Sequence, residues 1–361
     1  MKGLYKKITG ILVVCNLLSP GRPAYSQDIH FSQYANTPLL LNPAFTGDLK
    51  GNMRATTNYR SQWSSIAVPY KTFYTSYEIT LLKTDNRRFL GFGVSFYNDK
   101  VGDFELNTSL LNFSFAGNLP LDRKNDIAIG VQGGFGQHSF SPAKLRWGSQ
   151  YNGMNFDPNL QAGEGFYFNK SIYRDLSAGM TWNYDGNYGK GGIYSRSTKK
   201  PRANLGISLF HINRPNVSFY EGVQEKMYSK LVVHGSFTLI SKRTDASLIP
   251  SFIYTTQGPS RELLLGGMFR YLLKEGTLYT GFTDGYAISF GGYFRMADAF
   301  ILTTYLEFKQ LSFGVSYDAN ISKLYIASSG RGGVEFSLKY MTPQALWFNQ
   351  QGKLRKNRAK F

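Results

Sequence analysis

The sequence predicts an all-β protein, a single transmembrane antiparallel β-barrel of the outer membrane with about 14 strands. The chain begins with an export signal, and its charged residues make up 18%, below the roughly 25% typical of soluble domains, while Gly (38), Phe (28) and Tyr (25) are abundant. Short segments alternate apolar with small or polar residues. No window after the signal is as long and apolar as a membrane helix requires. A closed barrel bonds every backbone group in lipid without such a window.

The first residues predict a secretory signal peptide, residues 1–26. A basic start precedes the apolar core ILVVCNLL (11–18), and PAYS (23–26) offers small residues before a cut. The apolar run is too short for a membrane anchor, which needs about 20 residues. Cys15 leaves a lipoprotein signal open as an alternative, although Val14 stands where a small residue is required.

Charge and cysteine content exclude several classes of function. Residues 1–26 hold the only cysteine and four basic residues, so their removal lowers the formal net charge from +18 to +14 and leaves no thiol chemistry. A basic chain can bind nucleic acid, but export argues against this. The basic residues gather only in KLRKNRAK (353–360). We predict a basic tail over residues 342–361, which either contacts periplasmic machinery, anionic lipid or peptidoglycan, or is a solvated extension.

Alternation with period two predicts the strands. LGFGVSFY (90–97), for example, sets Leu, Phe and Val on one face against Gly, Ser and Tyr on the other. A soluble β-sandwich also alternates, but its polar face normally carries more Lys and Glu. Turn clusters such as LDRKND (121–126) separate the segments. Because bacterial outer-membrane barrels have an even number of strands, the fifteen candidate segments predict about 14 strands. In chain order the candidates lie near 53–60, 71–80, 90–97, 105–116, 127–135, 176–184, 203–212, 230–240, 246–255, 262–272, 276–283, 287–295, 299–308, 311–317 and 334–340.

The remaining stretches define the predicted domain organisation. Residues 27–50 form an N-terminal non-strand segment, a hatch or plug, and residues 51–341 form the barrel. Longer polar stretches at about 141–174 and 185–201 are candidates for loops on the outer face.

The N-terminal segment contains the block NTPLLLNPAFTG (36–47). Pro38 and Pro43 prevent regular strand pairing and bias the residues before them toward extended conformations. We therefore expect a fixed, irregular segment packed inside or under the barrel, either as a plug without a partner or as a contact for one.

No catalytic or metal-binding pattern emerges, so the sequence predicts a protein that is not an enzyme and has no cofactor. The four histidines lack metal-ligand spacing, and no nucleophile elbow or phosphate loop occurs. Acidic residues fall in predicted turns or singly on a lumen face, as does Glu335, which we interpret as solvated pore lining. An outer-membrane enzyme with scattered catalytic residues stays open as an alternative.

Several segments resemble one family in the same order along nearly the whole mature chain. QDIHFSQYANTPLLLNPAFTG (27–47), NYRSQW (58–63) and YKTFYTSYE (70–78) are similar to the N-terminal signature of the PorP/SprF family, outer-membrane proteins associated with type IX secretion and gliding motility in Bacteroidota. The resemblance continues through GVSFYNDKVG, SPAKLRWGSQY, INRPNVSF, PSFIYTTQGP and SYDANISKL. The basic tail departs from the pattern, since family barrels usually end close to the last strand.

The resemblance implies a docking function. Such barrels receive or retain secreted adhesins and other cargo through the cargo's C-terminal sorting domain, and connect them to periplasmic type IX components. One family member is instead a core secretion component, and the sequence leaves both roles open. An outer-membrane pore or transporter for small or hydrophobic solutes is the alternative, since NPA (42–44) is also similar to the N-terminal hatch of fatty-acid-transporting barrels.

Candidate residues for partner binding or plugging come from the amide- and aromatic-rich N-terminal motifs. The predicted site comprises Gln33, Tyr34, Leu40, Asn42, Pro43, Asn58, Arg60, Gln62 and Trp63.

Overall fold

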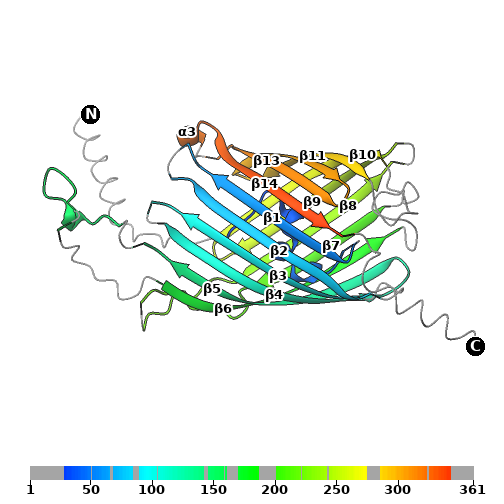
Figure 1. Ribbon diagram of the computed structural model, residues 1–361, viewed down its shortest axis with the longest axis horizontal. Coiled ribbons are helices and arrows are strands. Elements are labelled where there is room, and N and C mark those ends of the chain that lie inside the picture. The colour runs from blue at the N-terminus through cyan, green and yellow to red at the C-terminus, as the bar shows by residue number, and fades with distance from the viewer. Residues whose placement is uncertain are drawn as a thin grey trace, which may run out of the picture.

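The chain folds into a closed barrel of 14 antiparallel strands (Figure 1), which confirms the predicted fold class. The computed structural model describes residues 28–49, 51–65, 68–83, 89–103, 105–141, 145–157, 159–160, 170–186, 201–220, 222–241, 244–274, 285–322 and 325–342. The strands are β1 (Met53–Gln62), β2 (Tyr70–Lys83), β3 (Phe89–Val101), β4 (Leu106–Pro120), β5 (Asn125–Ser139), β6 (Lys170–Asp185), β7 (Arg202–Phe210), β8 (Lys230–Ile240), β9 (Ala246–Gln257), β10 (Ser260–Lys274), β11 (Tyr286–Arg295), β12 (Ala299–Phe308), β13 (Leu311–Asn320) and β14 (Arg331–Met341).

Each strand pairs with its neighbours in sequence, and β1 pairs with β14 to close the barrel. Fourteen of the fifteen candidate segments correspond to these strands. The fifteenth, 276–283, lies outside the described residues, as do the predicted signal peptide and nearly all of the predicted tail. In the described part of the chain, no helix is long and apolar enough to cross a bilayer.

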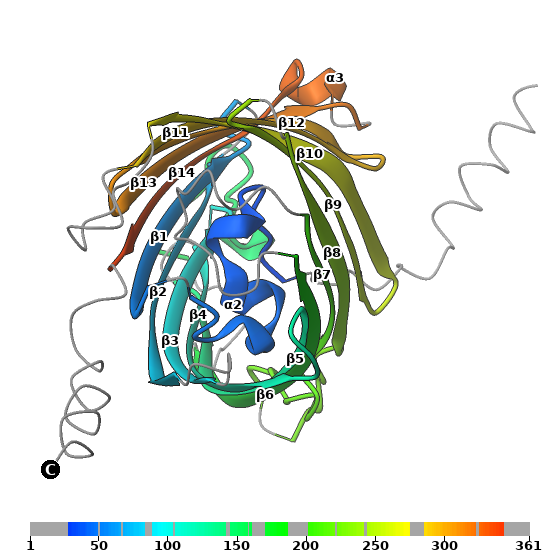
Figure 2. The same cartoon turned by 90° about the vertical axis from the view of Figure 1, so that its right-hand side faces the viewer.

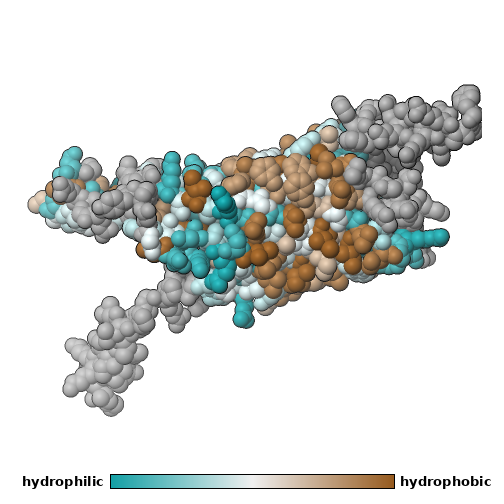
Figure 3. All heavy atoms as spheres, turned by 90° about the horizontal axis from the view of Figure 1, so that it is seen from below, coloured by the Kyte–Doolittle hydropathy of each residue, from teal (hydrophilic) through white to brown (hydrophobic). Residues whose placement is uncertain are grey.

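The barrel is apolar outside, and its inner face carries small and polar residues together with two clusters of buried apolar and aromatic side chains. On β5, Ile129 is 60% exposed and points outward, whereas Gly130 and Gln132 are buried and point inward. Exposed Leu, Ile, Phe and Val side chains form much of the surface over the strands, and polar residues lie nearer the ends (Figure 3). The apolar outer surface fits lipid around the barrel.

The barrel has two distinct ends. We call the end at which β1 begins (Met53) and β14 ends (Met341) the base, and the opposite end the mouth. The two longest connections, 140–169 and 211–229, join strands at the mouth. Residues 186–201 join β6 to β7 at the base. The sequence had placed 141–174 and 185–201 together on one outer face; this was wrong, because antiparallel β6 separates them and itself begins at Lys170.

The N-terminal segment, residues 28–49, lies in the lumen (Figure 2). It contains three short helical turns, η1 (Tyr34–Asn36), α2 (Pro38–Leu41) and η2 (Pro43–Phe45). A proline begins both α2 and η2, where its missing N–H costs no hydrogen bond. Asp28 bonds to Gln257 at the mouth, and Gly47 approaches Gly91 near the base, so the segment runs through the lumen from mouth to base.

Candidate functional site

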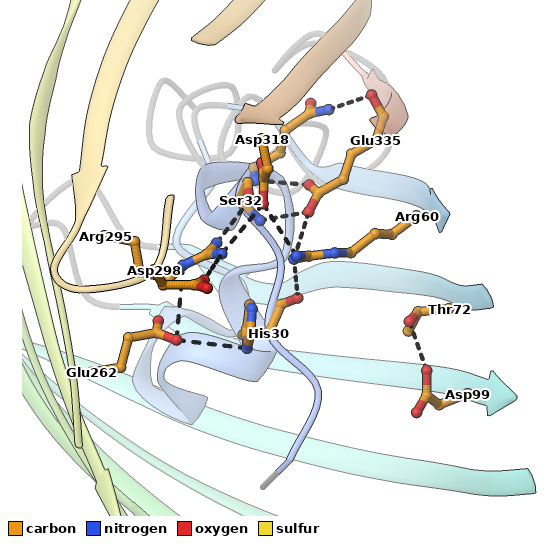
Figure 4. Close-up of polar contacts among 11 residues, drawn as sticks. His30, Ser32, Arg60, Thr72, Asp99, Glu262, Arg295, Asp298, Asp318 and Glu335 are labelled. Carbon is orange, nitrogen blue, oxygen red and sulfur yellow. Dashed lines mark hydrogen bonds and ion pairs between the residues drawn. The ribbon is translucent and has the colours of Figure 1, made fainter. Parts of the chain in front are cut away.

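A buried carboxylate on the barrel wall holds the backbone of the N-terminal segment. The N–H groups of Ser32 and Gln33 donate to the Glu335 carboxylate at 2.7 and 2.9 Å (Figure 4). Arg60 Nη1 donates to Glu335 Oε1 at 3.0 Å and to the carbonyl oxygen of His30 at 2.7 Å. Glu335 is 0% exposed, so its interpretation as solvated pore lining was wrong. The two N–H groups and the guanidinium replace the water that its charge would otherwise require.

Asp318 and Arg295 extend this cluster across the lumen. Asp318 Oδ2 accepts from Ser32 Oγ at 2.7 Å, Arg60 Nη2 at 3.1 Å and Arg295 Nη1 at 3.2 Å. Arg295 also donates to Ser32 Oγ at 2.8 Å and to Asp298 at 3.0 Å. Removing one partner of a buried ion pair typically costs about 3–5 kcal/mol, because the other charge is left uncompensated. The cluster therefore couples the position of the segment to the barrel wall.

A second charged cluster fixes the start of the described segment at the mouth. Asp28 Oδ2 lies 2.6 Å from His211 Nε2 and 3.0 Å from Lys230 Nζ. The amide of Gln257 accepts from the Asp28 N–H at 2.9 Å and donates to Asp28 Oδ1 at 3.1 Å. On its other side, His211 Nδ1 lies 2.8 Å from Asp175 Oδ1. His211 thus joins the segment to β6.

These contacts shift the titration of both groups. Burial raises the pKa of Asp28, but the charges and hydrogen bonds of His211 and Lys230 together outweigh it and hold this pKa well below its usual value. Burial lowers the pKa of His211, yet Asp28 and Asp175 raise it to about 9. At neutral pH the cluster therefore holds an imidazolium between two carboxylates.

Asn42 connects the middle of the segment to the wall. Its Nδ2 group lies 3.1 Å from the carbonyl oxygen of Met180, 3.2 Å from that of Ile207 and 3.1 Å from His234 Nε2. Its Oδ1 accepts from the Ala44 N–H at 2.9 Å, which caps η2. One fully buried amide thus shapes the turn and fixes it to β6, β7 and β8.

Two wall glycines allow the backbone of the segment to approach closely. A Cβ atom at Gly130 would collide with the backbone of Pro43, and one at Gly91 would collide with that of Thr46. Small inward-facing residues on β3 and β5 therefore make room for the segment.

Aromatic and apolar side chains complete the packing. Tyr34 lies edge-on to Tyr293, with ring centroids 5.6 Å apart, and its hydroxyl is 2.5 Å from Ser251 Oγ. Leu40 packs against a buried cluster formed by Phe31 of the segment and by Tyr74, Tyr97, Leu110 and Tyr173 of the wall.

The structure brings together six of the nine predicted site residues where the segment meets the wall: Gln33, Tyr34, Leu40, Asn42, Pro43 and Arg60. Asn58 points into the lumen and is fully buried, but its side-chain amide has no hydrogen-bond partner among the described residues. Gln62 and Trp63 lie at the mouth end of β1. There Gln62 pairs with Tyr70 and Gly333, and the Trp63 ring packs on Tyr70 at 4.9 Å. The role of all nine in partner binding stays a prediction.

Sequence reasoning missed most of the charged partners. Asp28, His211, Asp318 and Arg295 were not nominated, and no local motif marks them. Asp28 and His211 are 183 residues apart, and Ser32 and Asp318 are 286 apart. The one available signal was the inward register of acidic residues such as Glu335, which the alternation of β14 already fixed.

The chain belongs to the family of type IX secretion system membrane proteins PorP/SprF, whose family model matches residues 24–340. Among solved structures, the toluene transporter TbuX of Ralstonia pickettii is 9% identical, with a TM-score of 0.48 over 86% of this chain and 94% of that one. The monoaromatic hydrocarbon channel CymD is 8% identical, with a TM-score of 0.49 over 85% and 92%. No curated protein matches the chain.

Proposed function

We propose that this barrel is a non-enzymatic docking protein of the type IX secretion system, which binds a secreted, adhesin-like cargo protein through the cargo's C-terminal sorting domain. Membership of the PorP/SprF family supports the assignment of the protein to type IX secretion. The docking role is supported by one observation above all: buried charged groups hold residues 28–49 in place along the lumen. Because a fixed segment occupies the lumen, the barrel is better suited to presenting a binding surface than to passing a solute.

We infer that the mouth faces the outside of the cell. Outer-membrane barrels have short periplasmic turns and longer extracellular loops. The mouth carries the connections 140–169 and 211–229, and the base carries both chain ends of the barrel. The base is then the side on which periplasmic type IX components would reach the protein, whether it is a core component or a partner for particular cargo.

Exposed apolar side chains at the mouth support binding of a protein there. Met154 is 86% exposed and Ile326, in the short helix α3 (Tyr325–Ser328), is 90% exposed; Tyr220 is also exposed. These residues lie in connections beyond the strands. Aromatic residues and Met are enriched in protein interfaces. By contrast, the described β4–β5 turn at the base is mostly charged, with Arg123 and Lys124 exposed.

The proposal is tested by affinity purification of the tagged protein from crosslinked outer membranes of its host, followed by mass spectrometry. We expect a large secreted protein with a C-terminal sorting domain to dominate the bound material. A tagged unrelated outer-membrane barrel from the same membranes is the control. Recovery of the barrel alone, or of the same proteins as the control, would count against docking.

A pore or transporter is the second candidate, and one row of wall residues favours it. Thr56, Ser76, Ser95 and Asn112 lie directly opposite one another on β1 to β4. Each is buried, faces the lumen and has a side-chain oxygen without a hydrogen-bond partner in the described part of the chain. Buried polar atoms of this kind usually bind water. Planar-bilayer conductance separates the candidates: a docking barrel stays closed until residues 28–47 are deleted, whereas a pore conducts with them present.

A further inference from the structure

A cavity of about 80 Å³ lies between the N-terminal segment and strands β8 to β10 near the mouth. Its floor is apolar, and its rim includes His30 and Glu262. A water molecule needs only about 10–15 Å³ on this scale, so the cavity has room for a group about the size of an aromatic ring with a short chain. The floor is formed by Tyr34, Leu41, Val232, Ile253 and Leu264.

Glu262 is an acceptor that the protein leaves largely unused. Its side chain is 23% exposed, and its ion pairs are long: 3.6 Å to His30 Nδ1 and 3.8 Å to Arg295 Nε (Figure 4). Arg295 directs Nη1 to Asp298 and Asp318 and Nη2 to Ser32 Oγ instead. Glu262 makes no hydrogen bond within the described ranges, so its carboxylate has lone pairs available for a donor in the cavity.

The charges around the cavity favour a cation. Among the residues that line the cavity, two carry a carboxylate, Asp28 and Glu262, and one carries a permanent cation, Lys230, which pairs with Asp28 at 3.0 Å. In a poorly hydrated site such an imbalance raises the local concentration of positive ligands. Glu262 is therefore the lining carboxylate that has only long contacts, to His30 and Arg295, in the described part of the chain.

We propose that this cavity is a binding site for a small amphipathic cation, an apolar ring or short alkyl chain that carries an ammonium group. The apolar part lies on the floor beside Tyr34 and Val232, and the ammonium donates to Glu262. A charge-assisted hydrogen bond and burial of the ring supply the affinity. The site needs no passage through the barrel and is independent of cargo docking.

The test uses para-fluorophenethylamine and the full-length mature protein in detergent, with binding followed by fluorine NMR line broadening. The matching alcohol and para-fluorophenylacetate are the comparison ligands, since they share the ring and differ in the polar head. We expect the amine to bind most tightly and the carboxylate least. Equal binding of all three, or preference for the carboxylate, would overturn the proposal.

Three variants test whether the probe binds in the cavity. Val232→Trp fills the floor and should abolish binding, whereas Val233→Trp, on the opposite face of β8, should leave it unchanged. Glu262→Gln keeps the shape of the side chain and should weaken the amine about tenfold while changing the alcohol less than about twofold. Folding of each variant is checked by heat-modifiable mobility on a gel. Loss of binding in both tryptophan variants, or an unchanged amine affinity in Glu262→Gln, would refute the site.

Discussion

Replacing Glu335 with glutamine should release the N-terminal segment from the wall while leaving the barrel closed. Glu335 accepts the N–H groups of Ser32 and Gln33 and pairs with Arg60, and all of these groups are buried. A glutamine retains one acceptor oxygen, but its amide N–H₂ group faces donors. Among the described residues, Arg60 then keeps Asp318 as its carboxylate partner.

The expected magnitude follows from the lost bonds. A hydrogen bond to a charged group contributes about 1.5–3 kcal/mol, and a buried donor left without a partner costs about 1–3 kcal/mol. Since glutamine still serves one donor, we take the net loss as about 3 kcal/mol. This corresponds to an increase of about 100-fold in the equilibrium constant for release of the segment.

Cysteine labelling measures that equilibrium. The only native cysteine, Cys15, lies in the predicted signal peptide, so a single cysteine introduced by Thr37→Cys serves as a unique reporter. Thr37 is 3% exposed, and its hydroxyl makes only a 3.4 Å contact to the Tyr34 carbonyl oxygen. A bulky charged maleimide should therefore modify the reporter cysteine only when the N-terminal segment has been released from the barrel wall.

The matched control is Glu307→Gln, which changes a wall carboxylate bonded to Arg270 at 2.7 and 2.9 Å. We expect its labelling rate to match that of the unsubstituted reporter protein, and the rate in Glu335→Gln to rise about 100-fold. Equal rates in all three proteins, with the barrel intact on gels, would refute the assignment of Glu335 as an anchor.

Three further predictions concern other contacts of the segment, with labelling measured relative to a free thiol in solution. Asn42→Ala removes the donor to two wall carbonyls and the η2 cap, so the reporter cysteine should label about 30-fold faster, for a loss of about 2 kcal/mol; an unchanged rate would contradict the anchoring role. Gly130→Val collides with the Pro43 backbone and should keep the segment out of the lumen in a folded barrel, seen as full labelling; a protected reporter would contradict this. The pKa of His211 is raised to about 9, so its contribution is complete below its usual value of about 6.5 and is lost as the pH rises through 9. A cysteine introduced by Ile29→Cys should therefore label faster above that pH. If this pH dependence is absent when His211→Gln is added, His211 is its source. A labelling rate that does not change with pH in the parent reporter protein would exclude His211.

Period-two alternation predicted the barrel well because lipid and lumen impose opposite chemistry on successive side chains. Residues 90–97 of β3 and the whole of β13 follow it without interruption. β6 was predicted six residues too short at its start, because Arg174 faces outward near the mouth and interrupts the apolar face. A charged residue there is compatible with a strand that extends beyond the hydrocarbon layer.

The seat of the N-terminal segment was only partly predictable. The prolines and the density of amides indicated a fixed irregular segment, and Gln33, Asn42 and Arg60 do join it to the wall. Their acidic partners depend on the closure of the barrel, which brings β1 beside β14. No short-range pattern encodes that contact, so Glu335 and Asp318 could be placed on a lumen face but not assigned to partners.

The most direct test of cargo docking is site-specific photocrosslinking in the host. A photoreactive amino acid is introduced at Met154 or Ile326 at the mouth, and at Arg123 or Lys309 at the base as controls. The docking account predicts adducts with a large secreted protein carrying a C-terminal sorting domain from the mouth positions and none from the base positions. Adducts with that cargo from the base alone, or no cargo adduct at any mouth position, would contradict it.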